Sequence, residues 1–199
     1  MRLMDVYGQH ARRLAAQYES ITFEDTHRDV LHLIPVEPCR VLDIGAGSGR
    51  DAAALAARGH TVFAAEPTDE MRKEGQRIHA DSDITWVDDG LPELAVIRGG
   101  AETFDLIMLT AVWMHLDGDE RVRAMGHLRD LLARGGRIIM SLRHGPVPEG
   151  RLLFAVTAAE TTELAASAGL DLIHSSERED MLGRDKITWS FLAFQRNAG

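Results

Sequence analysis

Acidic residues follow three successive short apolar runs of the sequence. Asp43 lies near the end of the first run, Glu66 directly follows the second, and Asp88 and Asp89 follow the third. Such runs predict β-strands, and the carboxyl ends of parallel strands form the edge at which open α/β sheets bind their ligands. One acid at a strand end can be a solvated loop residue. Acids after three strands together favour a site for a ligand with hydroxyl and amino groups.

A glycine-rich turn, Gly-Ala-Gly-Ser-Gly at residues 45–49, separates the first apolar run from a helical segment. Glycines let a backbone pass close to a ligand, although Ser48 or Asp51 capping a simple strand-to-helix turn is the alternative. Glu66 lies 66 − 45 = 21 residues after Gly45, where an acid accepts hydrogen bonds from ribose hydroxyls. An acid after the third strand can accept from an adenine amino group. The turn and the acids together favour a ligand that contains adenosine.

The turn departs from the dinucleotide-binding fingerprint at one position. Counted from Gly45, the pattern G-x-G-x-x-G requires glycine at position 50, where this chain has Arg50. A dinucleotide places its anionic pyrophosphate at the helix N-terminus, whereas S-adenosylmethionine carries a cationic sulfonium and a zwitterionic tail. Acids near the turn suit the second ligand. We expect Asp43 to receive the tail ammonium, directly or through water.

The ordered series of motifs resembles the class I S-adenosylmethionine-dependent methyltransferases. The resemblance begins with VLDIGAGSG at residues 41–49 and covers roughly residues 40–142. Glu66-Pro67 followed by Met71 is similar to the ribose-binding turn of this family, and Asp88-Asp89 before Leu91-Pro92 to its adenine-binding segment. Residues 104–107 and 131–138 resemble its fourth strand and its turn into the fifth.

The resemblance implies S-adenosylmethionine as cofactor and a set of cofactor-binding positions. The spacing from Asp88 to Leu91-Pro92 is one residue shorter than the common pattern, so Asp88 and Asp89 stay alternatives as the adenine partner. The implied cofactor-binding residues are Asp43, Gly45, Ala46, Gly47, Gly49, Glu66, Pro67, Met71, Asp88, Asp89, Leu109 and Thr110.

The elements that must position these residues alternate along the chain, which predicts a doubly wound α/β fold with a mainly parallel sheet. Thr157 with Glu160 forms a capping-box pattern, and Gly135-Gly136 is expected to break the chain before the fifth strand. The last two strands lie too close for a crossover helix, which predicts an antiparallel hairpin. The resemblance implies seven strands in the order 3-2-1-4-5-7-6, the last antiparallel. Strands are expected at residues 40–44, 61–65, 84–87, 104–109, 137–142, 170–175 and 187–194, and helices at 5–19, 24–33, 51–58, 69–79, 119–132 and from 157 to 169.

The length favours one domain over residues 1–199, with a helical N-terminal cap at 1–36 and the α/β core at 40–199. The cap contains Tyr7, His10 and Tyr18. In related enzymes such a segment covers the cofactor, and a lid would exclude water. Amphipathic packing on the sheet edge is the alternative.

The composition disfavours two classes of partner. Thirty-one acidic residues against 22 basic ones give a formal charge of −9, which repels a nucleic-acid backbone. No segment approaches the roughly 20 apolar residues of a membrane span. The polar start of the chain and the lone Cys39 lead us to expect a cytoplasmic protein; the oligomeric state is open.

Methyl transfer from a sulfonium needs chiefly an aligned nucleophile, so a dedicated base is optional. If the acceptor must lose a proton, His115 after the fourth strand and His144 after the fifth are the candidate catalytic bases, with local packing as the alternative for each. His27 and His32, five apart on a helix, do not share a face, so no metal site is expected.

We therefore predict an S-adenosylmethionine-dependent methyltransferase that acts on a small molecule. The acceptor atom stays open among oxygen, nitrogen, sulfur and carbon. The alternatives are a non-catalytic module that binds the cofactor or docks a partner, and a nicotinamide-dependent oxidoreductase, which Arg50 and the terminal hairpin disfavour.

Overall fold

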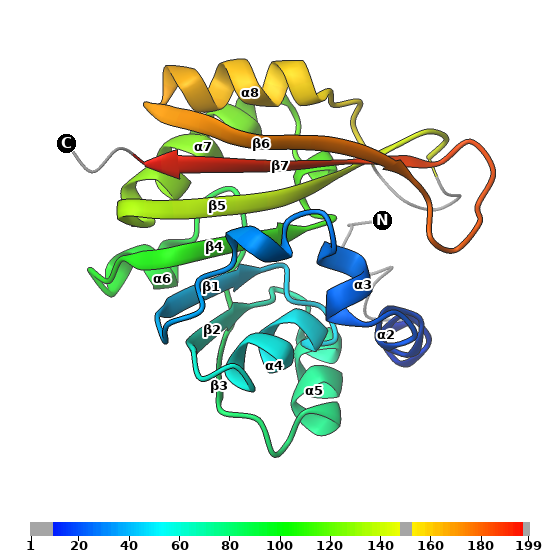
Figure 1. Cartoon of the computed structure of the whole chain (residues 1–199). Coiled ribbons are helices and arrows are strands. Elements are labelled where there is room, and N and C mark those ends of the chain that lie inside the picture. Colours follow the sequence, from blue (N-terminus) through cyan, green and yellow to red (C-terminus); the bar gives the residue numbers. More distant parts are fainter. Residues whose placement is uncertain (1–9, 148–152, 197–199) are drawn as a thin grey trace.

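The computed structural model describes residues 10–147 and 153–196. These residues form a seven-stranded sheet in the predicted order β3-β2-β1-β4-β5-β7-β6 (Figure 1). Strand β7 runs antiparallel to both of its neighbours, β5 and β6. The strands are β1 (Arg40–Ile44), β2 (Thr61–Ala65), β3 (Ile84–Val87), β4 (Phe104–Thr110), β5 (Leu132–His144), β6 (Leu170–Glu179) and β7 (Thr188–Arg196).

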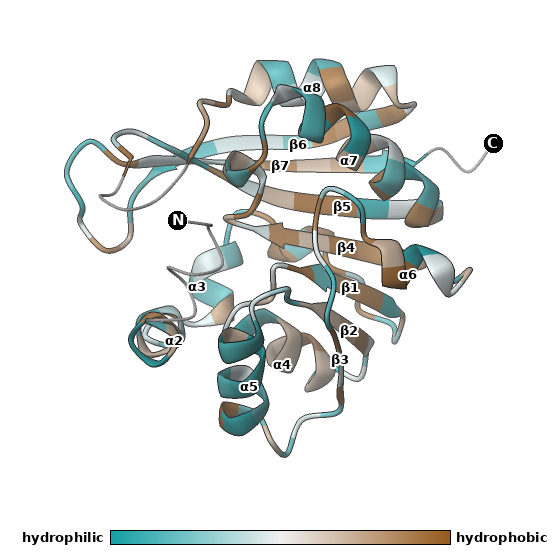
Figure 2. Cartoon of the chain, turned by 180° about the vertical axis from the view of Figure 1, so that it is seen from behind, coloured by the Kyte–Doolittle hydropathy of each residue, from teal (hydrophilic) through white to brown (hydrophobic). Residues whose placement is uncertain are grey.

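Helices cover both faces of the sheet, as the two opposite views in Figures 1 and 2 show. Helix α4 lies on one face, whereas α6, α7 and α8 lie on the other. The helices are α2 (Ala11–Glu19), α3 (Phe23–His27), α4 (Arg50–Ala56), α5 (Asp69–Ile78), α6 (Ala95–Gly99), α7 (Gly118–Leu131) and α8 (Ala158–Ser167), with 3-10 turns η1 (Leu31–Leu33) and η2 (Trp113–His115).

Alternation along the strands divides the core into two clusters. On β1, Val41 packs with Leu55 of α4, whereas Leu42 packs on the other face with Leu128 of α7. Successive side chains of a strand point to opposite faces, so a sheet covered on both faces needs apolar residues at almost every position. Asp43 interrupts this pattern. It is 2% exposed on the face that α4 covers, and that position brings it beneath the glycine-rich turn.

Three expected elements differ from the structure. The helix expected at 24–33 is divided into α3 and η1, and the short α6 was missed. Strand β5 begins at Leu132, so the glycine pair at 135–136 lies inside a strand and not before it. The reason is a bulge: Leu132 pairs with Phe104 and Arg137 with Leu106, which leaves several residues of β5 opposite one of β4.

The cap of α8 confirms half of the expected capping box. The hydroxyl of Thr157 accepts from the N–H of Glu160 at 3.1 Å, as predicted. The Glu160 carboxylate instead lies 3.3 Å from Arg121, which is buried. A complete capping box is found at α7, between Asp117 and Glu120.

Helices α2 and α3 and the loop between β6 and β7 lie at the end of the sheet toward which the parallel strands point (Figure 1). The first part of the helix expected at 5–19, including Tyr7, lies outside the described residues. Arg178 of β6 donates to the backbone carbonyl of Asp25 at 3.1 Å, and its guanidinium lies 4.2 Å from the ring of Phe191. The terminal hairpin therefore holds α3 in place.

Within the described residues, no helix is long and apolar enough to span a bilayer.

Candidate functional site

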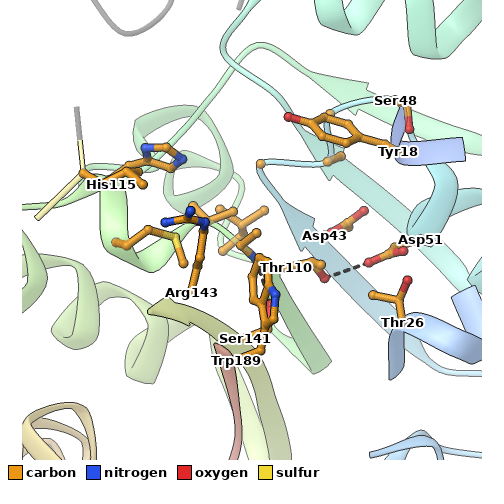
Figure 3. Close-up of a pocket in the computed structure, with 18 of the residues that line it drawn as sticks. Tyr18, Thr26, Asp43, Ser48, Asp51, Thr110, His115, Ser141, Arg143 and Trp189 are labelled. Carbon is orange, nitrogen blue, oxygen red and sulfur yellow. Dashed lines mark hydrogen bonds between the residues drawn. The ribbon is translucent and has the colours of Figure 1, made fainter. Parts of the chain in front are cut away.

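A cavity of about 660 Å³ opens at the carboxyl ends of the parallel strands (Figure 3). The glycine-rich turn and the ends of β1 and β2 form one side of it. The ends of β4, β5 and β7 and the β6–β7 loop form the other side, and α2 contributes Tyr18. Its volume falls within the range of about 300–1,000 Å³ that is typical of small-molecule sites.

Glu66 organises the glycine-rich turn. Its Oε2 accepts from the backbone N–H of Gly47 at 2.9 Å, and its Oε1 accepts from the N–H of Thr68 at 2.8 Å. The side chain is buried, and burial raises the pKa of Glu66 above its usual value although these hydrogen bonds oppose the shift. A carboxylate has about four lone-pair sites, so the same group that fixes the turn can also accept from ligand hydroxyls.

At the cavity wall, Asp43 presents one carboxylate oxygen without a partner in the described part of the chain. Among the described residues, its buried Oδ2 has no hydrogen-bond partner. Burial, together with the nearby charge of Asp51, raises the pKa of Asp43 well above its usual range. A buried acceptor without a partner is costly unless a ligand supplies a donor. The arrangement therefore fits a cationic ligand group such as an ammonium.

The glycines of the turn divide into two kinds. Gly45 and Gly47 line the cavity, with φ of +67° and +57°. Gly49 does not line it: with φ of +85° it is the N-cap of α4, and a Cβ there would meet Trp86 at 2.8 Å. No side chain caps α4, so the alternative in which Ser48 or Asp51 caps a simple strand-to-helix turn is wrong. Of the predicted turn residues, Ala46 also lines the cavity.

Arg50 ties the N-terminal cap to the turn. Its Nη1 donates to the carbonyl oxygens of Tyr18 at 3.1 Å and Ile21 at 3.5 Å. The Tyr18 ring in turn lies 3.4 Å from where a Cβ on Gly47 would stand. The residue that breaks the dinucleotide fingerprint thus holds α2 against the glycine-rich turn.

Asp51 is a site residue that the sequence analysis assigned only to capping. Its carboxylate accepts from Nε of Arg50 at 2.7 Å and from the hydroxyl of Thr110 at 2.7 Å, and it lies 2.8 Å from Nε2 of His27. Burial would raise the pKa of Asp51, but the charges of His27 and Arg50 outweigh it and hold the pKa well below its usual range. The partner is 24 residues away on a separate helix, so no local spacing could have revealed the pair.

Neither candidate adenine partner lines the cavity. The Asp88 side chain is 71% exposed and lies 3.2 Å from Arg72. The Asp89 carboxylate accepts from the N–H groups of Gly90 and Ile97, each at 2.9 Å, and so fixes the loop into α6. The cavity is lined nearby by the predicted Pro67 and Met71, and by Gly90 and Leu91, which were not singled out for contact.

Leu109 and Thr110, two predicted cofactor-binding residues, lie at the end of β4 and point to opposite faces of the sheet. Leu109 is fully buried in the core on the α7 face and does not line the cavity, whereas Thr110 does. This follows from strand alternation, since only one of two neighbouring side chains can face a given side.

The two candidate histidines have different positions. His115, from η2, lines the cavity beside Met114. His144 is not among the lining residues; its Nε2 lies 2.7 Å from the hydroxyl of Ser190 on β7. The described residues contain no cluster of three His, Cys, Asp or Glu side chains that could hold a metal ion.

Asp180 and Trp189 shape the far wall and were not predicted. The indole Nε1 of Trp189 donates to Asp180 at 2.8 Å, and the same carboxylate accepts from Arg184 at 2.6 and 3.0 Å. These contacts fold the β6–β7 loop over the cavity. Sequence patterns do not predict such a loop, because it depends on charges brought together by the hairpin.

Comparison with known proteins shows which proteins the chain is similar to. A family model described as a methyltransferase domain matches residues 41–136. An uncharacterized methyltransferase of Bacillus cytotoxicus is 31% identical over 108 residues, which is 51% of this chain and 45% of that protein. The chain spans about half the length of the curated relatives that it matches.

Two solved structures share the fold across almost the whole chain. The chain is similar to a TehB-like SAM-dependent methyltransferase from Corynebacterium glutamicum, with 21% identity, coverage of 98% of both chains and a TM-score of 0.70. It is also similar to the 1,6-didemethyltoxoflavin-N1-methyltransferase of Burkholderia thailandensis, with 21% identity, coverage of 95% of this chain and 89% of that chain, and a TM-score of 0.68. That structure contains its acceptor and S-adenosylhomocysteine.

Proposed function

We propose that the chain is a class I S-adenosylmethionine-dependent methyltransferase that transfers the methyl group of S-adenosylmethionine to a small-molecule acceptor, a proposal that the match to a methyltransferase domain supports. The observation that carries the proposal is the pair of buried acids at the glycine-rich turn. Asp43 offers a carboxylate oxygen without a partner among the described residues, and Glu66 holds the turn through Gly47.

The residues present fit the cofactor. Glu66 would accept from the ribose hydroxyls and Asp43 would receive the tail ammonium, with Met71 and Leu91 beside the nucleoside. When bound, S-adenosylmethionine supplies a methyl group on a sulfonium, whose leaving group is neutral. Tyr18 over the turn would exclude water and restrict the orientation of the cofactor, which is the main requirement of a direct displacement.

The remaining part of the cavity would hold the acceptor. It is lined by Met114, Phe154 and Trp189 and by the polar side chains of His115 and Arg143. Apolar walls with a few polar groups are typical of small-molecule sites. The Burkholderia neighbour methylates such a molecule, which supports the same class here. His115 is the candidate base; for His144, the hydrogen bond to Ser190 favours the alternative of local packing.

Calorimetric titration with S-adenosylhomocysteine and, separately, with NAD tests the cofactor assignment. We expect the first to bind with one site per chain and the second not to bind. Asp43→Asn should weaken the first interaction, because the uncharged amide compensates an ammonium less well. Tighter binding of NAD would overturn the proposal in favour of an oxidoreductase.

A further inference from the structure

Thr110 stands at the border between the two parts of the cavity. It ends β4, which lies between β1, with the cofactor-binding turn, and β5, with Ser141 and Arg143. Figure 3 shows Thr110 between Asp51 on one side and Ser141 and Trp189 on the other. A methyl group that passes from cofactor to acceptor must cross this border.

The Thr110 hydroxyl donates its proton in a hydrogen bond to Asp51. An ionised carboxylate can only accept, so in the 2.7 Å contact Thr110 must be the donor. Asp51 stays ionised because His27 and Arg50 hold its pKa well below the usual range, against the effect of burial. Toward a ligand in the cavity, Thr110 therefore offers only oxygen lone pairs. Its hydroxyl can accept a hydrogen bond from a ligand but has no proton left to donate to one.

His27 completes this arrangement from the N-terminal cap. Its side chain is 2% exposed, and its Nε2 must donate to the same Asp51 oxygen that accepts from Thr110. The two donors fix the position of that oxygen, and Arg50 holds the other one at 2.7 Å. The carboxylate cannot turn away from Thr110 without breaking a buried contact.

We propose that Thr110 selects a nitrogen acceptor, by accepting a hydrogen bond from the N–H of the group that is methylated, and that His27 is a positioning residue acting through Asp51. This inference rests on the proposed function. Thiolates and carbon nucleophiles have no such proton to donate. A hydroxyl must give up its proton to become a good nucleophile, whereas an amine attacks with its lone pair and keeps its N–H.

The transfer then balances without a further reactant. The amine lone pair forms the N–C bond, the S–C bond breaks with its electron pair moving to sulfur, and the product ammonium releases one proton to solvent. Thr110 accepts a hydrogen bond throughout and takes up no proton.

Sinefungin, which has an amino group in place of the sulfonium methyl, provides the probe. Titrations with sinefungin and S-adenosylhomocysteine give the affinity for sinefungin divided by the affinity for S-adenosylhomocysteine. This ratio measures the contribution of the added amine. We expect Thr110→Val, which keeps the shape but loses the oxygen, to lower this ratio about 5-fold to 20-fold, in line with about 1–1.5 kcal/mol for a hydrogen bond. Thr110→Ser should keep the ratio, and any loss of affinity that is common to both compounds cancels in it.

Two outcomes separate failure of this inference from failure of the proposed function. An unchanged ratio in Thr110→Val, with normal binding of S-adenosylhomocysteine, would overturn the role of Thr110 alone. If the unmodified protein binds neither compound, the proposed function fails as well.

The positioning role of His27 has its own readout. His27→Leu should lower the sinefungin ratio, His27→Gln should restore it through its amide N–H, and the His27→Leu/Thr110→Val double variant should lower it no further than Thr110→Val. A His27→Leu variant with a lower melting temperature but an unchanged ratio would show a merely structural residue.

Discussion

The backbone N–H of Gly47 donates to Oε2 of Glu66 at 2.9 Å, which joins the turn after β1 to the acid after β2. The two residues follow β1 and β2, neighbouring parallel strands whose ends meet at the cavity. A change at either residue therefore alters both the ligand contacts and the shape of the turn. The carboxylate that shapes the turn is also the one that, in the proposed function, accepts from the ribose hydroxyls of the cofactor.

Glu66→Gln should weaken binding of S-adenosylhomocysteine about 10-fold to 100-fold. The amide keeps one accepting oxygen, so either Gly47 or Thr68 loses its acceptor and a ribose hydroxyl loses a charged one. Calorimetry on the folded variant measures the effect. Glu70→Gln, at an exposed position of α5, is the control and should bind normally. Unaltered affinity in Glu66→Gln would remove Glu66 from the ribose role.

The sequence predicted the fold, and it named several residues that the structure brings to one cavity, because those features are local. The strand, the glycine turn and Glu66 follow one another at spacings set by the first βα unit. The place of Asp51 in the cavity wall was not predicted, because it depends on the contact with His27, which lies on a separate helix. Leu109 was misjudged by one position in a strand whose faces alternate. Which of Asp88 and Asp89 faces a ligand depends on loop contacts that no spacing encodes.

Binding of S-adenosylhomocysteine should release a proton from Asp43. Burial and the charge of Asp51 raise the pKa of Asp43, and a bound ammonium would favour the ionised form. Affinity should therefore increase as pH rises through the raised pKa and decrease below it. Titrations at several pH values at which an α-amino group stays protonated, in buffers of different ionisation enthalpy, give the number of protons released.

Asp43→Asn should abolish this release, whereas Asp88→Asn, whose side chain is exposed, should retain it. The same proton count in Asp43→Asn and in the unmodified protein would assign the linkage to another group.

Helix α2 should gain amide protection when the cofactor binds. Tyr18 of this helix contacts the turn at Gly47, so an occupied site gives the helix a further surface to pack on. Hydrogen exchange over residues 11–19 measures the change, with α8 as an internal reference that should not respond. Equal protection with and without S-adenosylhomocysteine would favour permanent packing over a lid.

His115→Gln should lower turnover roughly 10²-fold to 10⁴-fold if His115 is the base, with little change in cofactor affinity. His144→Gln is a matched comparison, because His144 is bonded to Ser190 and does not line the cavity. We expect it to keep normal turnover. If His115→Gln raises only the Michaelis constant for the acceptor, His115 shapes the pocket and does not carry a proton.

Gly47→Val gives an inactive control for assays of transfer. A Cβ at this position would lie 3.4 Å from the Tyr18 ring, and φ of +57° is strained for a branched residue. The variant should lose cofactor binding while circular dichroism shows an intact fold. Gly126→Val adds the same side chain where a Cβ would meet nothing within 4 Å, and should bind normally.

Transfer of tritium from methyl-labelled S-adenosylmethionine tests the central claim most directly. The protein is incubated with fractionated metabolites, proteins and RNA, in parallel with Gly47→Val. We predict label in a small-molecule fraction with the unmodified protein and none with the variant. Label in no fraction, from a protein that binds S-adenosylhomocysteine, would contradict catalysis and indicate a cofactor-binding module. Label confined to protein or RNA would contradict the small-molecule acceptor.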